Sequence, residues 1–529
     1  MRLRRVARYW PEVRIGVHVG ISAGIDAVTK RVPGLARYAA AALAGVALHV
    51  AFPPRTLWWT AIVAFAVLWF TLRGVRVRRA ALLGFVFGLG FFLPHLLWIN
   101  DFLGRDFGLP PWLGLSALMA LFTAATCALV PLVARLPAAP VWAALLFVLQ
   151  ESARSRVPAN GFPWGRVAFG QVEGPYLPLA AIGGAPLVSF AVVVTGFGVA
   201  AWAARPRDPR RAWAVLPLAA ALAVTPLVGV DAQHGERTVA VVQGNAPDVG
   251  LGLLHERDTL RRNHLRATAE LTARIRAGEV PRPDLVVWPE SATGAGERDP
   301  VLDRAVAELG VPTLIGALRR VDGREENAVI AWDPRTGAGP SYAKQELVPF
   351  GEYIPMRSLA TLVTPFAEAP DLSAGTEPGV FDIAGTRVGV GICYEAAYDA
   401  VLRESAAEGA RLFVVPTNNA WYGPGEMTYQ QLGMARLRAV EHGRAVVVAA
   451  ISGVSAVVRP DGSVVRSTGM FTEDLLVESV PLRSDTTLAT RFGGVLEALF
   501  ALMALAGAGW PLLRGWRARQ SRRSRSVAV

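Results

Sequence analysis

Long apolar stretches dominate the first 230 residues of the chain and return once near its end. Most of them are close to the roughly 17 to 25 apolar residues that a helix needs to cross a bilayer. An eighth stretch follows a long polar interval, and the fifth is the shortest. The pattern predicts a polytopic α-helical membrane bundle of about eight spans. The expected spans are 37–53, 57–72, 80–99, 112–134, 139–153, 176–203, 212–230 and 494–513.

The polar interval 233–490 has a different pattern, in which short apolar runs with strand periodicity alternate with helical periodicity. Strands that alternate with helices favour a layered α/β domain. The expected strands are 239–243, 285–288, 313–316, 328–332, 388–393, 412–416, 445–451 and 455–459. The expected helices are 255–277, 300–309, 397–408 and 428–442.

These patterns divide the chain into five segments. Residues 1–36 form a basic leader without the compact apolar core and small-residue cleavage site of a signal peptide. Residues 37–232 form the seven-span membrane domain and 233–490 the α/β domain. Residues 491–514 hold the eighth span, and 515–529 form a basic tail.

The composition agrees with a membrane protein, since 52% of the residues are hydrophobic and only 18% are charged. A net charge of +12 raises the possibility of a nucleic-acid partner. The basic residues instead gather in short runs between apolar stretches, a pattern that reports membrane topology. We therefore expect a lipid bilayer and no nucleic acid as the partner.

Three arginine clusters predict the orientation. They lie between spans two and three, between spans six and seven, and after span eight. If the N-terminus is cytoplasmic, all three fall on the cytoplasmic side. We thus expect a multi-pass protein of the cytoplasmic (inner) membrane, with both termini cytoplasmic and the α/β domain extracytoplasmic. The loop 154–175, which carries Arg154, Arg156 and Arg166, falls outside and mildly breaks the rule.

The chain has only two cysteines, Cys127 and Cys393. Cys127 lies in an apolar helical run, where a thiol packs as a small hydrophobe. Cys393 ends the strand pattern 388–393, where an exposed turn is expected to begin. A single thiol at a strand end is a candidate nucleophile. A buried structural cysteine is the alternative for such a residue.

Two further stretches carry reactive groups that we expect to lie beside the Cys393 thiol. Trp288-Pro289-Glu290 ends a strand pattern at a carboxylate, and Lys344 precedes a run that reads Leu-Val-Pro-Phe-Gly-Glu-Tyr-Ile-Pro. A carboxylate can take a thiol proton as general base. An ammonium stabilises the thiolate and the oxyanion of a tetrahedral intermediate. Glu, Lys and Cys together suit acyl transfer through a thioester.

Each signal has an ordinary structural alternative, because a lone Glu or Lys is usually a solvated surface residue. Lys344 is unusual for another reason: of 54 lysines and arginines, only Lys30 and Lys344 are lysine. The three stretches hold no histidine, which argues against a Cys-His pair. The sequence has neither the Cys/His spacing of a zinc site nor a phosphate-binding Gly-Lys-Ser/Thr motif. We expect no metal and no cofactor.

The order Trp-Pro-Glu, Lys, Gly-Ile-Cys-Tyr-Glu resembles the nitrilase superfamily. With apolar spans around it, the chain is similar to the apolipoprotein N-acyltransferase family. Further matching stretches begin at Ala51, Gly161, Val242, Thr417 and Ala435. The resemblance implies an αββα sandwich docked on a membrane bundle.

The resemblance also implies roles for individual residues. Glu290 would be the general base, Lys344 the stabiliser of thiolate and oxyanion, and Cys393 the nucleophile. Glu352 would orient Lys344, while Tyr394 and Glu395 would shape the pocket behind the thiol. Trp421, in the stretch Thr-Asn-Asn-Ala-Trp-Tyr, would also contribute to the site.

The implied reaction moves an acyl chain from a phospholipid, with phosphatidylethanolamine as expected donor, onto Cys393. The acceptor would be the α-amine of the diacylglyceryl-cysteine at the N-terminus of an apolipoprotein. A membrane-anchored amidohydrolase that uses water is the alternative, and a non-enzymatic scaffold or transporter is a third. Two departures bear on substrate binding: 248–252 lacks a tryptophan that many family members carry, and Gln431 stands where many have histidine.

Overall fold

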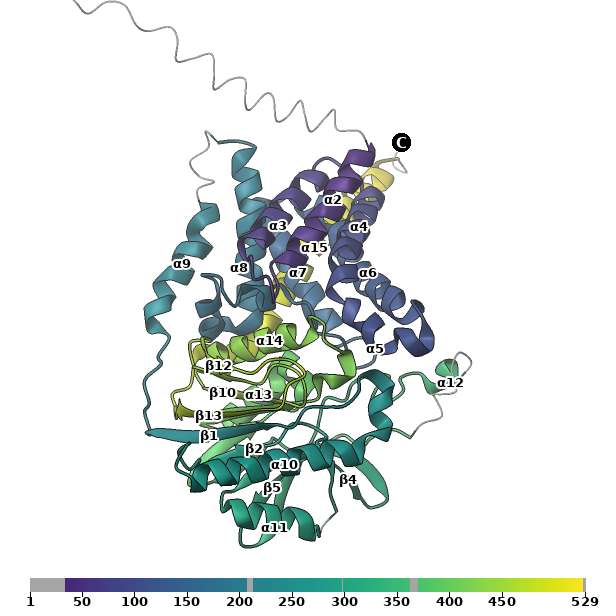
Figure 1. The fold of residues 1–529 in the computed structure, drawn as a ribbon. Coiled ribbons are helices and arrows are strands. Elements are labelled where there is room, and N and C mark those ends of the chain that lie inside the picture. The colour runs from purple at the N-terminus through teal and green to yellow at the C-terminus, as the bar shows by residue number, and fades with distance from the viewer. Residues whose placement is uncertain (1–33, 207–212, 297, 362–369, 527–529) are drawn as a thin grey trace, which may run out of the picture.

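The computed structural model describes residues 34–206, 213–296, 298–361 and 370–526. They form two parts, a bundle of apolar helices and a domain of two stacked sheets (Figure 1). The predicted basic leader lies almost entirely outside the described residues.

The bundle contains helices at most of the expected spans. In the described residues, four helical segments are long and apolar enough to cross a membrane: Val77–His95, Pro110–Val133, Leu177–Ala203 and Leu488–Pro511. Leu82, Leu121 and Leu502 on three of them are more than half exposed, as expected of lipid-facing side chains. The bundle helices are α2 (Gly34–Val50), α3 (Trp59–Leu72), α4 (Val77–His95), α6 (Pro110–Val133), α7 (Ala139–Arg154), α8 (Ala180–Ala203) and α15 (Leu488–Ser526).

Three elements differ from the expected spans. The third expected span ends early, at His95, and a separate helix, α5 (Leu97–Phe107), follows it. The seventh is short: the apolar helical segment Trp213–Leu227, which contains α9 (Leu216–Val224), is about 22 Å long at 1.5 Å per residue. The eighth belongs to a longer helix, because α15 begins at Leu488 and continues to Ser526, through most of the expected tail.

The α/β domain consists of two mixed sheets. The first has the order β13-β1-β2-β4-β5-β6, and β3 pairs with β4. Its strands are β1 (Glu236–Gln243), β2 (Leu285–Val287), β3 (Thr293–Gly294), β4 (Thr313–Val321), β5 (Arg324–Asp333), β6 (Gly337–Ala343) and β13 (Asp474–Pro481). The second has the order β12-β11-β10-β9-β8-β7. Its strands are β7 (Val380–Ile383), β8 (Thr386–Val390), β9 (Leu412–Thr417), β10 (Val446–Ala450), β11 (Ala456–Val458) and β12 (Val464–Ser467).

The two sheets face each other across a core of alternating apolar residues, including Val241, Val287, Val390 and Val414. Helices α10 (Arg257–Arg276) and α11 (Pro300–Leu309) pack on the outer face of the first sheet. Helices α13 (Asp399–Ala407) and α14 (Met427–His442) cover the second. This αββα sandwich confirms the expected domain fold.

The membrane bundle docks on the α13/α14 layer (Figure 1). A single apolar cluster joins the two parts and runs from Phe52 and Phe91 in the bundle, through Leu437 of α14, to Val448 of the second sheet. The outer helix layer of the sandwich is therefore buried on both sides. Any group that the second sheet presents at this edge lies close to the membrane part.

Candidate active site

Glu290 lies on the turn that follows β2 and is 5% exposed. One of its oxygens accepts from Lys344 Nζ at 2.9 Å, and the other accepts from the backbone N–H of Asn418 at 2.8 Å. Gly316 on β4 makes room for this turn, because a Cβ there would lie 2.0 Å from the Pro289 carbonyl oxygen. The sequence around Glu290 thus fixes a buried carboxylate with little freedom to move.

Lys344 follows β6 directly, and its side chain is 1% exposed. Nζ lies between two carboxylates, at 2.9 Å from Glu290 Oε1 and 3.0 Å from Glu352 Oε1. Burial would lower the pKa of Lys344, but the charges of Glu290 and Glu352, and a thiolate at Cys393, outweigh burial and raise it well above its usual value. The amine therefore stays an ammonium.

Cys393 begins the 3₁₀ turn η7 (Cys393–Ala397), three residues beyond the end of β8 at Val390. Its φ of 53° is left-handed, a conformation that non-glycine residues adopt only where the surrounding structure holds them. The prediction that Cys393 lies at an exposed turn is wrong. Cys393 is 4% exposed, because the membrane bundle and α14 cover this end of the sheet. Cys127, in α6, is buried and fits its expected packing role.

The thiol is protonated at rest. Burial, followed by the negative charge of Glu290, raises the pKa of Cys393 to about 12, although Lys344 and hydrogen bonds to Thr417 and Gln431 oppose the rise. A thiolate is the reactive form, so the proton has to leave during the attack. Glu290 lies near enough for its negative charge to act on the thiol.

A side chain that the sequence did not indicate completes the polar centre. Asn327 on β5 is buried, and its Nδ2 donates to Glu290 Oε1 and to Glu352 Oε1, both at 2.7 Å. Glu352 also accepts from the backbone N–H of Val348 at 2.8 Å. Asn327 and Lys344 together therefore hold the two carboxylates apart at a fixed spacing, and Glu352 holds Lys344 in place. Asn327 directly precedes the expected strand 328–332 and follows the polar run Arg-Glu-Glu, so the sequence gives no signal that it is buried.

Glu395 ties the turn of Cys393 to the segment after β6. Its oxygens accept from the hydroxyl of Tyr342 at 2.9 and 3.0 Å, and from the backbone N–H groups of Gln345 at 2.7 Å and Ile392 at 2.5 Å. Burial raises the pKa of Glu395 to about 7, against these hydrogen bonds and the charge of Lys344. The residue is a structural link between the lysine and cysteine segments.

Tyr394 points toward the membrane part. Its hydroxyl donates to the Gly161 carbonyl at 3.3 Å, and its ring stacks near Trp164 with centroids 6.4 Å apart. Both partners belong to the loop after α7, at one of the stretches that carry the family resemblance. Cys393 and Tyr394, neighbours in sequence, thus face the catalytic domain and the bundle respectively.

Trp421 and Tyr422 lie on η8 (Asn419–Tyr422), against α5. The Trp421 ring is 6.0 Å from Phe102 of α5, and Tyr422 is 5.2 Å from Phe102 and 5.0 Å from Trp98. Burial, and then a charge on Cys393, raise the pKa of Tyr422 well above its usual value. Tyr422, which the sequence analysis did not single out, is therefore electrostatically coupled to the polar centre around Cys393.

Gln431, one of the departures from the family pattern, contacts the Cys393 thiol. Its Nε2 donates to Cys393 Sγ at 3.4 Å, and its Oε1 accepts from Thr417 Oγ1 at 2.8 Å. Its neighbour Gln430 donates to the His95 carbonyl at 3.2 Å and accepts from Trp164 at 2.6 Å. The start of α14 therefore joins the thiol to the bundle. The described residues contain no group of three or more His, Cys, Asp or Glu side chains that could hold a metal ion.

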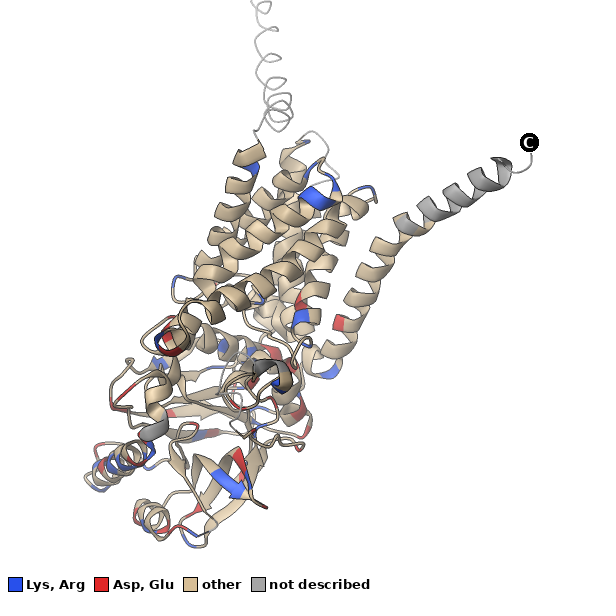
Figure 2. Ribbon diagram, turned by 90° about the vertical axis from the view of Figure 1, so that its right-hand side faces the viewer, with Lys and Arg blue, Asp and Glu red and all other residues tan. Residues whose placement is uncertain are grey.

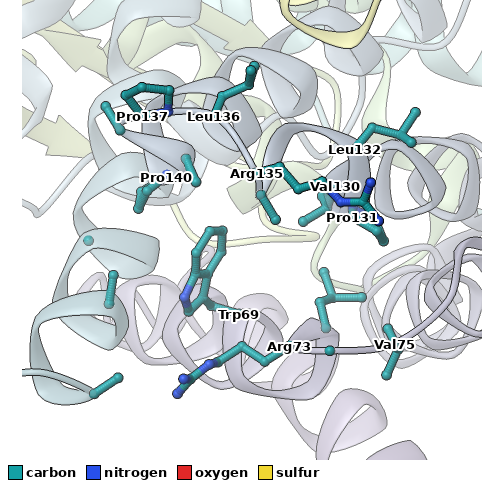
Figure 3. Close-up of a pocket in the computed structure, with 18 of the residues that line it drawn as sticks. Trp69, Arg73, Val75, Val130, Pro131, Leu132, Arg135, Leu136, Pro137 and Pro140 are labelled. Atoms are coloured by element: carbon teal, nitrogen blue, oxygen red, sulfur yellow. The ribbon is translucent and has the colours of Figure 1, made fainter. Parts of the chain in front are cut away.

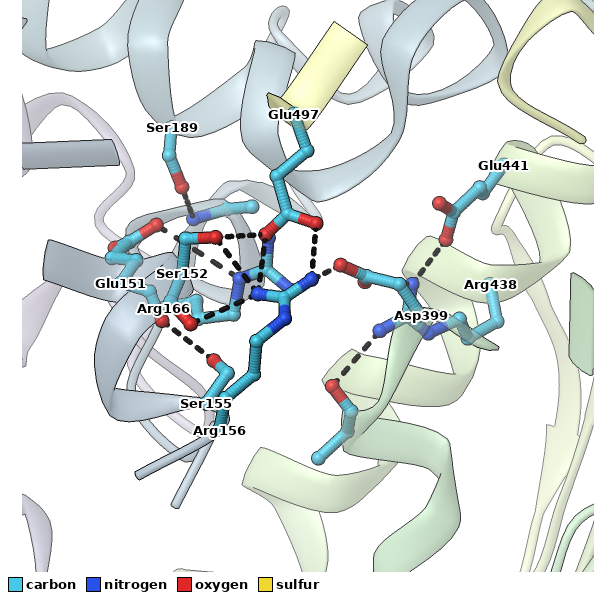
Figure 4. A network of polar contacts seen from close by, with 12 residues as sticks. Glu151, Ser152, Ser155, Arg156, Arg166, Ser189, Asp399, Arg438, Glu441 and Glu497 are labelled. Carbon is cyan, nitrogen blue, oxygen red and sulfur yellow. Dashed lines mark hydrogen bonds and ion pairs between the residues drawn. The ribbon is translucent and has the colours of Figure 1, made fainter. Parts of the chain in front are cut away.

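A second set of buried charges lies at the far end of the η7 turn, and we call it the junction cluster: Arg166, Asp399, Arg438 and Glu441 (Figure 4). Arg438 donates from Nε to the Ala396 carbonyl at 2.9 Å and from Nη2 to the Ala397 carbonyl at 3.0 Å. Burial would raise the pKa of Asp399, but the charges of Arg166 and Arg438 outweigh it and hold that pKa well below its usual value. The cluster fixes the last residues of the turn that Cys393 begins.

The junction cluster reaches into the bundle. Arg166 Nη1 donates to Asp399 Oδ2 at 2.6 Å, and Arg438 pairs with both Asp399 and Glu441 (Figure 4). Glu441 lies against the kink of α8, where a Cβ on Gly184 would be 2.4 Å from its Oε1. Helix α8 can therefore pack on α14 only because glycine occupies this position.

The loop arginines that mildly broke the topology rule have partners here. Arg154 donates to the carbonyls of Phe162 and Trp164, at 2.9 and 2.5 Å. Arg156 pairs with Glu497 of α15, at 2.7 Å. Together with Arg166, these residues fasten the loop after α7 to its surroundings. Their charges serve packing, so they carry little weight as an orientation signal.

Comparison with known proteins supports the two-part organisation. The family described as "Apolipoprotein N-acyltransferase N-terminal domain" matches residues 44–198, and the family described as "Carbon-nitrogen hydrolase" matches residues 238–488. Over 500 residues the chain is 36% identical to the apolipoprotein N-acyltransferase of Mycolicibacterium smegmatis, across 87% of this chain and 83% of that protein. It is 32% identical over 512 residues to the one of Chromobacterium violaceum, across 91% and 94%.

Among solved structures, an amidase from Nesterenkonia sp. is similar at 20% identity and a TM-score of 0.36, across 51% of this chain and 99% of that one. The first matched family covers most of the bundle and the second covers the αββα domain. The relatives extend over both parts, at more than four fifths of their own length. The chain belongs to the apolipoprotein N-acyltransferase family, the membrane branch of the nitrilase superfamily.

Proposed function

We propose that the chain moves an acyl chain from a phospholipid to the N-terminal amine of a lipoprotein through a thioester on Cys393. The proposed donor is phosphatidylethanolamine, and the proposed acceptor is the α-amine of diacylglyceryl-cysteine. The observation that carries the proposal is the buried ion pair of Glu290 and Lys344, whose charges act on the Cys393 thiol. The relatives' name, apolipoprotein N-acyltransferase, describes transfer of an acyl group to an apolipoprotein nitrogen.

In the first half-reaction, Glu290 takes the thiol proton as Sγ attacks the acyl ester carbonyl. Lys344 is the cation beside the carbonyl oxygen as negative charge develops there. The tetrahedral intermediate then collapses, the ester C–O bond breaks, and Glu290 returns the proton to the departing lysophospholipid oxygen. A Cys393 thioester remains.

In the second half-reaction, the lipoprotein amine attacks the thioester carbonyl. Glu290 takes the amine proton, and Lys344 again faces the oxyanion. The C–S bond breaks and the thiolate recovers its proton from Glu290, which leaves an amide on the lipoprotein. The steps need no oxidant and no activated co-substrate, because the donor is already an ester.

The docking of the bundle on α13 and α14 supports lipid substrates. Both substrates carry long acyl chains, and the turn of Cys393 lies at the edge of the sandwich that the bundle covers. Tyr394 and Tyr422, beside the thiol, reach the loop after α7 and helix α5. A thiol at this junction can receive a chain that comes from the lipid phase.

The protein is a bacterial membrane protein, and we propose the orientation expected from the sequence: inner membrane, both termini cytoplasmic, αββα domain outside. A reporter inserted after Asp322, an exposed residue of the β4–β5 hairpin, checks it. A reporter active only outside the cytoplasm should work there, and a cytoplasm-only reporter should not. The reverse result would overturn the orientation.

The function itself is tested with a diacylglyceryl-cysteine peptide and a defined phospholipid. Mass analysis should show the peptide gain one acyl group while the phospholipid becomes its lyso form. Phosphatidylglycerol with the same acyl chains tests the head group. Release of free fatty acid with an unchanged peptide would instead favour the hydrolase that uses water, which neither the relatives nor the buried thiol favours.

A further inference from the structure

A cavity of about 950 Å³ opens in the bundle (Figure 3). The helix ends that line it lie at the end of the bundle away from the αββα domain (Figure 1). Its walls come from the ends of α3, α6 and α8 and the starts of α4 and α7. Cys393, Glu290 and Lys344 lie in the other part of the molecule, beyond the opposite ends of these helices. The cavity is therefore separate from the proposed active site.

The polar wall of the cavity is positive. Arg73, Arg76, Arg135 and Arg205 line it, and the lining residues that the structure describes include no Asp or Glu. Arg76, Arg135 and Arg205 are exposed to solvent. Figure 2 shows that basic residues gather at this end of the bundle. The cavity therefore favours an anionic ligand group.

The rest of the wall is apolar. Leu72, Val130 and Leu132 contribute aliphatic side chains, and Trp69 and Trp213 contribute indole rings. Tryptophan is enriched at the level of the lipid head groups, where one end of the ring is wet and the other apolar. A free inorganic anion would use the arginines and leave this apolar wall without a partner.

We infer that the cavity binds the head group of an anionic phospholipid, with its acyl chains along the outside of the bundle. Guanidinium groups match phosphate oxygens with paired hydrogen bonds. Basic pockets between membrane helices on the cytoplasmic side are known to take such head groups. This lipid is neither acyl donor nor acceptor, because it lies far from the thiol.

The test is native mass spectrometry of the full chain released from mixed bilayers of phosphatidylglycerol and phosphatidylethanolamine with identical acyl chains. The wild type should retain phosphatidylglycerol in preference. Arg135→Gln/Arg205→Gln should reduce that preference about tenfold or more, since each arginine near an anionic head group contributes roughly a factor of five. Arg78→Gln/Arg79→Gln, at the same end of the bundle but outside the cavity wall, loses the same charge and should behave as wild type.

Arg135→Lys/Arg205→Lys keeps the charge and should retain most of the preference, which separates head-group binding from misfolding. Acyl transfer in detergent, with phosphatidylethanolamine as the only lipid, should be unchanged in all variants. An undiminished preference in Arg135→Gln/Arg205→Gln would overturn the inference. Displacement of the lipid by millimolar inorganic phosphate would also overturn it, because the site would then bind a free anion.

Discussion

The two buried charge clusters at the two ends of the η7 turn differ in how their cations are held. At the Cys393 end, the ammonium of Lys344 contacts only side-chain oxygens, those of Glu290 and Glu352. At the Ala397 end, the guanidinium of Arg438 binds two backbone carbonyls as well as Asp399 and Glu441. The ammonium of Lys344 uses two of its three N–H donors and keeps one for a reacting oxygen, whereas the guanidinium of Arg438 is committed to the backbone.

This difference separates chemistry from positioning. A compact ammonium with free donors can follow charge as it develops on a substrate oxygen, while a planar guanidinium with fixed partners holds a segment in place. The chain uses arginine almost everywhere, so a lysine at the reactive end and an arginine at the structural end agree with these roles. We therefore expect substitutions at the Cys393 end to reduce acyl transfer and substitutions at the Ala397 end to reduce the stability of the fold.

The largest effect is expected for Cys393→Ala, which removes the nucleophile and should abolish acyl transfer. The control is Cys127→Ala, since Cys127 is buried in α6 and has only a packing role, worth roughly 1 kcal/mol or less. Transfer rates of purified variants in detergent give the comparison. Loss of activity in a folded Cys127→Ala protein would refute the assignment of the nucleophile.

Lys344→Arg should be nearly as severe although the charge is kept. The side chain is 1% exposed, and a guanidinium is too broad for the space between Glu290 and Glu352. A displacement of about 1 Å of an oxyanion donor can reduce the rate on the order of 10²-fold. The thermal unfolding midpoint shows whether the variant is folded, and a wild-type transfer rate would remove the lysine from the mechanism.

Arg438→Gln should act first on stability. It leaves Asp399 and Glu441 buried with one cation fewer, a change that costs about 3 to 5 kcal/mol in comparable buried pairs. It also frees the carbonyls of Ala396 and Ala397, so the η7 turn loosens. The midpoint of thermal unfolding in detergent should fall clearly. An unchanged midpoint together with a lost transfer rate would place Arg438 in the chemistry and break the comparison.

The smallest effect is expected for Arg156→Gln. The Arg156 side chain is 58% exposed, so water can take its place beside Glu497, whose side chain is 7% exposed and keeps the Ser152 hydroxyl as a donor. Pairs with both partners exposed contribute about 1 kcal/mol or less, and this half-buried pair should contribute somewhat more than that but less than the fully buried Arg438 pairs. The midpoint should shift much less than in Arg438→Gln, and a shift of equal size would show that exposure does not distinguish the two arginines.

Much of this arrangement follows from local sequence patterns. Strand and helix periodicity predicted the α/β domain, and three short stretches predicted that Glu290, Lys344 and Cys393 come together. The structure brings Glu290 and Lys344 into contact and places Cys393 within reach of their charges. Strand β6 was missed because Gly337, Gly339 and Pro340 are poor strand formers, and its pairing with β5 is a tertiary effect.

The junction cluster could not be read from the chain. Arg166 and Asp399 are 233 positions apart, and no periodicity within the chain reports a pair at such a separation. When only the sequence is considered, an arginine in a loop between apolar stretches indicates membrane topology and not a buried ion pair. The buried position of Cys393 was missed for the same reason, since the helices that cover its turn belong to the bundle and to α14.

The central claim is that Cys393 carries the acyl group between the two substrates. Wild-type protein incubated with phospholipid and no acceptor should gain the mass of one acyl chain on the peptide that contains Cys393. The adduct should be cleaved by hydroxylamine and discharged by a diacylglyceryl-cysteine peptide. Glu290→Gln, which keeps the shape of the side chain but cannot take the thiol proton, should form far less adduct. Full transfer without an adduct on Cys393, or a normal amount of adduct in Glu290→Gln, would contradict the account.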